Sequence, residues 1–164
     1  MRKTILFILL AAFSFLFAQE KGRKAPDFKL ENIKGKSVSL QNYLNEGPVL
    51  ICFWATWCKP CADELKQYLK IYKKLSAQGL KMIAISNDNE RSIAKVKPYV
   101  KRKKISCEVL LDPNRKVAKK YYANNVPHTV ILDKFGNIVY SHAGYKHGDE
   151  KKVKQIITDL LNQN

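Results

Sequence analysis

The sequence has few of the residues that metal-binding proteins need. Its 164 residues include only four cysteines and three histidines, and the single Cys-x-x-Cys pair is Cys58 and Cys61. A structural zinc site usually takes four ligands, from two such pairs or from one pair and closely spaced histidines. His128, His142 and His147 show no paired spacing. The sequence therefore argues against a zinc site and predicts no resident metal.

Acidic residues are also scarce. The chain has 14 acidic and 30 basic residues, which gives a formal net charge of +16 at pH 7. Such a charge favours acidic partners or anionic lipid surfaces, although solvated helix faces are the simpler interpretation. No nucleic-acid-binding motif accompanies the charge, so nucleic acid is not an expected partner. The basic runs lie at residues 101–104, 119–120 and 151–152.

The sequence lacks an apolar run of the roughly 20 residues that a membrane-spanning helix needs. The run Ile5–Phe17 is shorter; it follows two basic residues and precedes Ala18, which is the layout of a signal peptide. We expect residues 1–18 to be a cleaved signal peptide, with an uncleaved N-terminal anchor as the alternative. Either way residues 25–164, the predicted domain, would work outside the cytoplasm, as in a periplasm, where disulfides persist.

The cysteine pair lies between a predicted strand and a predicted helix. A continuous apolar run begins at Val49, and a helical pattern follows Cys61 to about Gln78. Cys58 would then lie at the helix N-terminus, where free N–H groups and the helix dipole stabilise a thiolate. A purely structural bridge this short would add little stability. The pattern predicts thiol–disulfide exchange, with Cys58 as the attacking and Cys61 as the resolving thiol.

Strand and helix patterns alternate through the rest of the chain, with no repeat or interdomain linker. Two short extended pieces over Phe28–Leu40 indicate an N-terminal hairpin, and the last two strands indicate a second one. This order predicts an α/β fold with a mixed central sheet flanked by helices. The further strands are expected at residues 80–86, 105–111, 129–132 and 138–142, and the further helices at 89–103, interrupted near Pro98, at 113–123 and at 149–161.

The segment Phe53–Cys61 (FWATWCKPC) resembles the active-site segment of the thioredoxin superfamily, above all its exported oxidoreductases of the TlpA/ResA type. Ala25–Phe28 is similar to an entry segment that this group shares with peroxiredoxins, and Val126–Thr129 to its cis-proline loop. The resemblance implies a thioredoxin fold without a cofactor and a cis peptide before Pro127. It also implies that substrate contacts come from Trp57, Val126 and Pro127.

The direction of the reaction is implied by the same resemblance. A proline before the second cysteine, here Pro60, matches the reducing members of the superfamily. The protein would then reduce disulfides of exported proteins, among which apocytochrome c, the client in cytochrome c biogenesis, is one in the family. An exported reductant would draw its electrons from a membrane thiol donor.

Two other functions are considered. A copper(I) metallochaperone would use the two thiolates and His128, which follows the proline loop and could lie near the cysteines. A peroxiredoxin is suggested by Ala25–Phe28, but the Pro-x-x-x-Thr-x-x-Cys segment of that class is missing. That segment places its threonine three residues before the cysteine, whereas Thr56 lies two residues before Cys58.

Glu64 is the candidate proton acceptor. Thioredoxins carry a buried acid where this sequence has Cys52, which is expected to be a buried apolar residue; its pairing with Cys107 stays open. Glu64 lies three residues after Cys61, on nearly the same helix face, whereas Asp63 points away. Both acids could instead only complement the helix N-terminus. ResA-like proteins carry a functional glutamate at this position, so the resemblance implies the same role for Glu64.

Overall fold

The computed structural model describes residues 22–163, so the predicted signal peptide lies outside the described residues. In this range a seven-stranded mixed sheet has the order β2-β1-β5-β4-β3-β6-β7. The strands are β1 (Lys29–Asn32), β2 (Ser37–Ser39), β3 (Val49–Trp54), β4 (Lys81–Ser86), β5 (Glu108–Leu111), β6 (His128–Leu132) and β7 (Ile138–Ala143). The helices are η1 (Leu40–Tyr43), α2 (Lys59–Leu75), η2 (Ser76–Gln78), η3 (Ile93–Lys95), α3 (Val96–Lys103), α4 (Lys116–Lys120) and α5 (Asp149–Asn162).

Strand β3 lies in the interior of the sheet, next to the middle strand β4, and all six of its residues are buried. It pairs with β4 in parallel and with β6 in antiparallel orientation. Because side chains alternate along a strand, Leu50, Cys52 and Trp54 pack on one face, and the residues between them pack on the other. The predicted mixed sheet is therefore confirmed, and the cysteine pair follows the buried interior strand β3.

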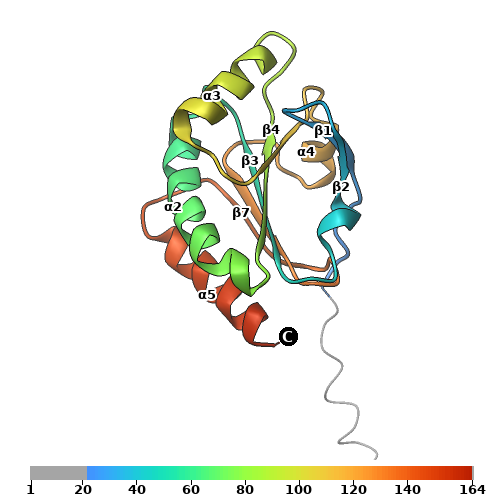
Figure 1. The fold of residues 1–164 in the computed structure, drawn as a ribbon, viewed down its shortest axis with the longest axis vertical. Coiled ribbons are helices and arrows are strands. Elements are labelled where there is room, and N and C mark those ends of the chain that lie inside the picture. The colour runs from blue at the N-terminus through green and yellow to red at the C-terminus, as the bar shows by residue number, and fades with distance from the viewer. Residues whose placement is uncertain (1–21, 164) are drawn as a thin grey trace, which may run out of the picture.

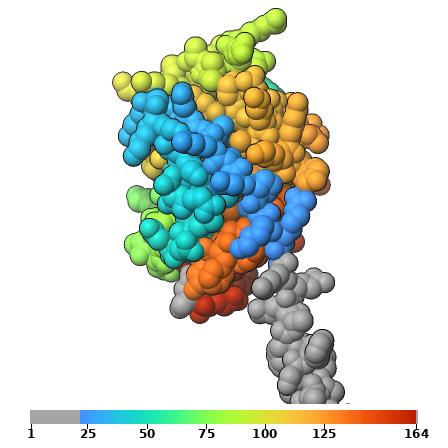
Figure 2. Space-filling model, turned by 90° about the vertical axis from the view of Figure 1, so that its right-hand side faces the viewer, coloured from blue at the N-terminus to red at the C-terminus, as the bar shows by residue number. Residues whose placement is uncertain are grey.

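Helices cover the two faces unequally. Figure 1 shows α2, α3 and α5 together on one face of the sheet and α4 on the other. The N-terminal strands form an antiparallel pair, Lys29 opposite Ser39, and β1 joins the sheet through β5. Figure 2 shows that these strands and η1 (blue to cyan) lie beside the α4 region (orange). No helix among residues 22–163 is both long and apolar enough to cross a bilayer.

Helix α2 begins and ends near its predicted limits. Pro60 occupies the first turn, where the N–H that proline lacks would have no intrahelical partner. Beyond Leu75 the chain makes the 3-10 turn η2, and Gly79 ends it with a φ of 109°, in the left-handed region that favours glycine.

Helix α5 matches the helix expected at 149–161, whereas α3 and α4 differ from the sequence prediction. The helix expected over 113–123 is shorter in the structure and covers only α4. It begins after Arg115, which has a left-handed φ of 55°, and Asp112 Oδ2 accepts a hydrogen bond from the Ala118 N–H near its start. The helix expected over 89–103 begins as η3 and continues as α3. The interruption expected near Pro98 is wrong: Pro98 is the third residue of α3, within the first turn, where its missing N–H costs no hydrogen bond. Strand β5 covers only the second half of the range expected for it.

Candidate functional site

Cys58 and Cys61 are joined by a disulfide with an S–S length of 2.00 Å. Cys58 is the N-cap residue of α2, and its Sγ accepts a hydrogen bond from the Cys61 N–H at 3.2 Å. Cys58 is 6% exposed, whereas Cys61 is fully buried. A thiol arriving from solvent therefore meets Cys58 first, and the backbone donor and helix dipole stabilise negative charge on its sulfur.

The turn before Cys58 is held by the buried Asp88. This carboxylate accepts hydrogen bonds from the Thr56 N–H (2.8 Å), the Thr56 hydroxyl (2.6 Å) and the Ser86 hydroxyl (2.9 Å). The turn is closed by a bond from the Cys58 N–H to the Ala55 carbonyl at 3.1 Å. Together these bonds fix the approach to the nucleophile, and the Trp57 side chain, 67% exposed, lies beside it in sequence.

Asp88 was missed by the sequence reasoning, although a signal for it exists. Strands β3 and β4 are parallel neighbours, so the residues that follow their carboxyl ends meet at the same edge of the sheet. Asp88 comes two residues after β4, and Thr56 two residues after β3. A polar residue in each place predicts a contact between them.

Glu64 lies on the buried face of α2, against β6. Its side chain is fully buried, and its Oε1 accepts a 2.8 Å hydrogen bond from the Thr129 hydroxyl. Its Oε2 has no hydrogen-bond partner among the described residues. Burial raises the pKa of Glu64 to about 8, with a smaller contribution from Asp149, while the Thr129 hydrogen bond opposes the shift. The carboxyl group therefore titrates close to neutral pH rather than in the acid range.

Cys52 lies within electrostatic reach of this acid. It faces Thr129 across the β3–β6 pair, on the side of the sheet that α2 covers. Burial raises the pKa of the Cys52 thiol well above its usual value, and the charge of Glu64 adds to the effect. The structure thus confirms Cys52 as a buried residue, with Glu64 reaching the same region from the helix. Cys52 and Cys107 are both free, so they do not pair with each other.

The proline loop and the cysteine pair lie at the same edge of the sheet. The Val126–Pro127 peptide is cis, as the resemblance implies. Strand β6 begins directly after Pro127, and its first residue, His128, faces Phe53 near the carboxyl end of β3. Val126 is half-buried and packs against both hydrophobic clusters, one on each face of the sheet. Trp57, Val126 and Pro127 therefore come from the loops at this edge.

His128 does not lie where the copper(I) alternative needs it. Its ring contacts Phe53 on the face opposite α2, with the ring centroids 6.2 Å apart. Its Nε2 lies 2.9 Å from the Ser141 hydroxyl, and burial lowers the pKa of the imidazole. No group of three or more metal-ligating side chains occurs in the described part of the chain. The alternation along β6 therefore turns the His128 ring to the face of the sheet opposite α2, and the copper(I) alternative is not favoured.

Comparison with known proteins agrees with this geometry. The sequence model of the AhpC/TSA family matches residues 21–141. The thiol-disulfide oxidoreductase ResA of Bacillus thuringiensis is 32% identical over 152 aligned positions, which cover 87% of this chain and 86% of that protein. The protein of the same name from Geobacillus kaustophilus is 33% identical over 170 aligned positions, which cover 98% of this chain and 87% of that protein.

A solved structure leads to the same group. A Chlorobium tepidum protein, proposed to be the thiol:disulfide interchange protein DsbE, superposes with a TM-score of 0.79 at 25% identity, covering 88% of this chain and 99% of that one. The fold and the disulfide at the start of α2 agree with these relatives. The chain therefore belongs to the thioredoxin-like AhpC/TSA family, and it is a thiol–disulfide oxidoreductase.

Proposed function

We propose that this oxidoreductase reduces disulfides in exported proteins, apocytochrome c being one class of client. The observation that carries the proposal is the position of the dithiol. Cys58 caps α2 and is the more exposed cysteine, while Cys61 and Glu64 lie buried behind it. Thiol–disulfide exchange with a protein client needs this asymmetry, because one sulfur must reach a bulky client and the other must remain shielded; the proline before Cys61 favours the reducing direction.

The exchange proceeds in two steps. The Cys58 thiolate attacks one sulfur of the client disulfide, a bond forms between the two proteins, and the client's other sulfur leaves as a thiolate. The Cys61 thiolate then attacks the Cys58 sulfur, which restores the Cys58–Cys61 disulfide and releases the client's second thiolate. Two electrons pass to the client, and its two thiolates take up protons.

Glu64 is proposed to accept the proton that Cys61 loses before the second step. A free thiol titrates near pH 8.5, so a base with a pKa close to that value makes the transfer nearly balanced. The pKa of about 8 that burial gives Glu64 meets this requirement. The acid lies on the same buried helix face as Cys61, three residues further along.

Substrate contacts are assigned to Trp57, Val126 and Pro127. The exposed indole of Trp57 offers a large apolar surface beside the nucleophile. The loop before Pro127 lies at the same sheet edge, where the backbone of Val126 could pair with an extended client chain. The leader-like residues 1–18 favour an extracytoplasmic site of action, in which case electrons must come from a membrane thiol donor.

Two measurements on the purified protein test the proposal. Its reduction potential is expected near the thioredoxin value of about −270 mV, and a value near about −120 mV would mark an oxidant instead. Cys61→Ser is expected to trap a client peptide as a mixed disulfide, because the resolving sulfur is gone. Cys58→Ser is the matched control; if it traps the peptide and Cys61→Ser does not, the roles of the two cysteines are reversed.

A further inference from the structure

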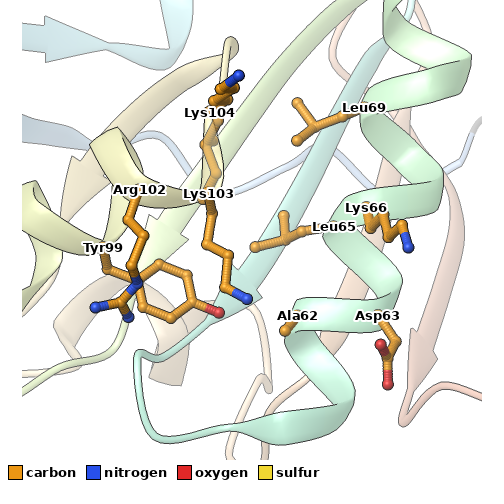
Figure 3. Close-up of a pocket in the computed structure, with 10 residues that line it drawn as sticks. Ala62, Asp63, Leu65, Lys66, Leu69, Tyr99, Arg102, Lys103 and Lys104 are labelled. Atoms are coloured by element: carbon orange, nitrogen blue, oxygen red, sulfur yellow. The ribbon is translucent and has the colours of Figure 1, made fainter.

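A groove runs between α2 and α3 beside the redox pair. Its volume is about 440 Å³, and it is lined from both helices and from Ile105, which follows α3. Figure 3 shows Leu65 and Leu69 pointing from α2 toward α3, and Tyr99 closing the groove from α3. The floor is therefore apolar, as is usual for a site that binds a side chain.

The edges of this groove are strongly basic. Four cations line it, and Asp63 is the one acid among the lining residues. In Figure 3 the side chains of Asp63 and Lys66 point away from α3, whereas the Lys103 ammonium points across the groove toward α2. None of the four forms an ion pair with an acid within residues 22–163. Two of them lie over the Tyr99 ring: Arg102 Cζ is 5.4 Å and Lys103 Nζ is 6.0 Å from the ring centroid. The cations are Lys66, Arg102, Lys103 and Lys104.

Two observations place the groove close to the catalytic pair. Ala62, which lines the groove, directly follows Cys61. On the other side, the Tyr99 ring packs against Trp54, the last residue of β3, with ring centroids 5.2 Å apart. A chain that lies in the groove is therefore next to the first turn of α2, which carries the disulfide.

Helix capping explains only part of this charge. Cations in the last turn of α3 complement the helix dipole, but Lys66 lies in the middle of α2 and has no such role. Lys104 has a φ of 53°, in the left-handed region where glycine would be less strained. A positive side chain thus occupies a place that local structure alone would assign to glycine.

We propose that this groove binds an acidic and apolar segment of the partner protein, next to that partner's reactive cysteine. Carboxylates would pair with the four cations, and an apolar side chain would cover Leu65 and Leu69. A planar lipid surface does not fit a concave groove between two helices. The inference rests on the proposed function, since it assigns a docking site to the partner of the same exchange reaction.

The test uses two fluorescent peptides in which serine replaces cysteine, so that no exchange chemistry takes part. They share one apolar sequence and differ in four positions, which are Glu in one and Gln in the other. Lys66→Glu with Lys103→Glu reverses charge in the groove. Lys151→Glu with Lys154→Glu, on the exposed side of α5, is the control with the same change in net charge. Binding is followed by fluorescence anisotropy at low and at physiological ionic strength.

The unchanged protein should bind the Glu peptide about tenfold more tightly than the Gln peptide at low salt, and the difference should shrink as salt is added. The groove variant should lose this preference, and the α5 variant should keep it. Lys104→Gly should weaken binding of the Glu peptide by about threefold without lowering the melting temperature. Equal loss in both double variants would overturn the inference in favour of a net-charge effect.

Two further outcomes are decisive. If the groove variant loses binding to phosphatidylglycerol vesicles but keeps its peptide preference, the groove serves a lipid surface and the inference fails. Reduction of a neutral disulfide peptide is measured in parallel. If that reaction does not occur while the Glu peptide still binds in the groove, the proposed reductase function is wrong and the docking site is retained.

Discussion

The Thr129 hydroxyl donates a 2.8 Å hydrogen bond to Oε1 of Glu64 and so joins β6 to α2 behind the redox pair. The Tyr68 hydroxyl lies 3.2 Å from the same Thr129 oxygen, which gives a short polar chain inside an otherwise apolar layer. Burial raises the pKa of Glu64, and this hydrogen bond limits the rise. The first two predictions follow from this balance.

Glu64→Gln should slow the resolution of a mixed disulfide by about 100-fold, because general acid–base groups commonly contribute that much. Trapping by Cys58 should still occur, so the mixed disulfide should accumulate in a stopped-flow experiment. Asp63→Asn is the matched control on the neighbouring, exposed residue and should change the rate little. An unchanged lifetime of the mixed disulfide in Glu64→Gln would leave Glu64 as a residue that only complements the helix dipole.

Thr129→Val should move the pKa of Glu64 above about 8, because the near-isosteric side chain cannot donate the hydrogen bond that lowers it. The pKa is measured directly by carbon NMR of the labelled glutamate carboxyl. Thr158→Val, on α5, is the control, since Thr158 bonds only the Lys154 carbonyl. A Glu64 pKa that falls or stays constant in Thr129→Val would contradict the assigned role of the hydroxyl.

The pH dependence of stability provides a third prediction. The folded-state pKa of Glu64 lies near 8, above the ordinary glutamate value of 4.5, so the folded protein holds a proton that the unfolded chain releases. The contribution of Glu64 to the free energy of unfolding is fully present below pH 4.5 and is lost as the pH rises toward 8. The loss amounts to at most about 1.4 kcal/mol per pH unit.

The oxidised Glu64→Gln variant should therefore gain stability relative to the unchanged protein as the pH increases. The difference in unfolding free energy between the two proteins, from urea titrations at pH 5, 7 and 9, cancels the contribution of the other titrating groups. A difference that does not vary with pH would show that Glu64 is ionised in the folded state throughout this range.

Much of the site could be predicted from the sequence because its signals are local. The continuous apolar run of β3, Pro60 in the first turn of α2 and the three-residue step from Cys61 to Glu64 each depend on neighbours in the chain. Gly79 ends the helical region of α2 and η2 for an equally local reason, because glycine tolerates the positive φ at that position. The mixed sheet then followed from the order of these elements.

The rest depends on contacts between residues far apart in the chain. Thr129 is 65 residues from Glu64, so no local pattern predicts that bond. Thr56 is 32 residues from Asp88, and their bond can be inferred only once β3 and β4 are known to be parallel neighbours. The face on which His128 lies depends on the pairing of His128 with Phe53, which the sequence does not specify. The shortening of α4 likewise depends on the left-handed turn at Arg115, where neither glycine nor asparagine signals it.

Asp88→Ala should destabilise the protein by about 3 kcal/mol, because the Thr56 N–H and two hydroxyls lose a charged acceptor in a buried place. Thr56→Val removes one of these bonds and keeps the backbone bond, so it should cost about 1 kcal/mol. Glu90→Ala, two residues beyond Asp88 and exposed, serves as the control. Urea unfolding of the oxidised proteins measures all three.

The same series should also affect exchange, because Asp88 fixes the turn that leads to Cys58. When the turn is loosened, Cys58 spends less time in line with an incoming disulfide. Asp88→Ala should therefore lower the rate of exchange by about tenfold, measured under conditions in which the variant is fully folded. Thr56→Val should lie between Asp88→Ala and the unchanged protein in both stability and rate. If Asp88→Ala costs no more stability than Glu90→Ala, the buried carboxylate does not hold the turn, and the rate of exchange should then be unchanged as well.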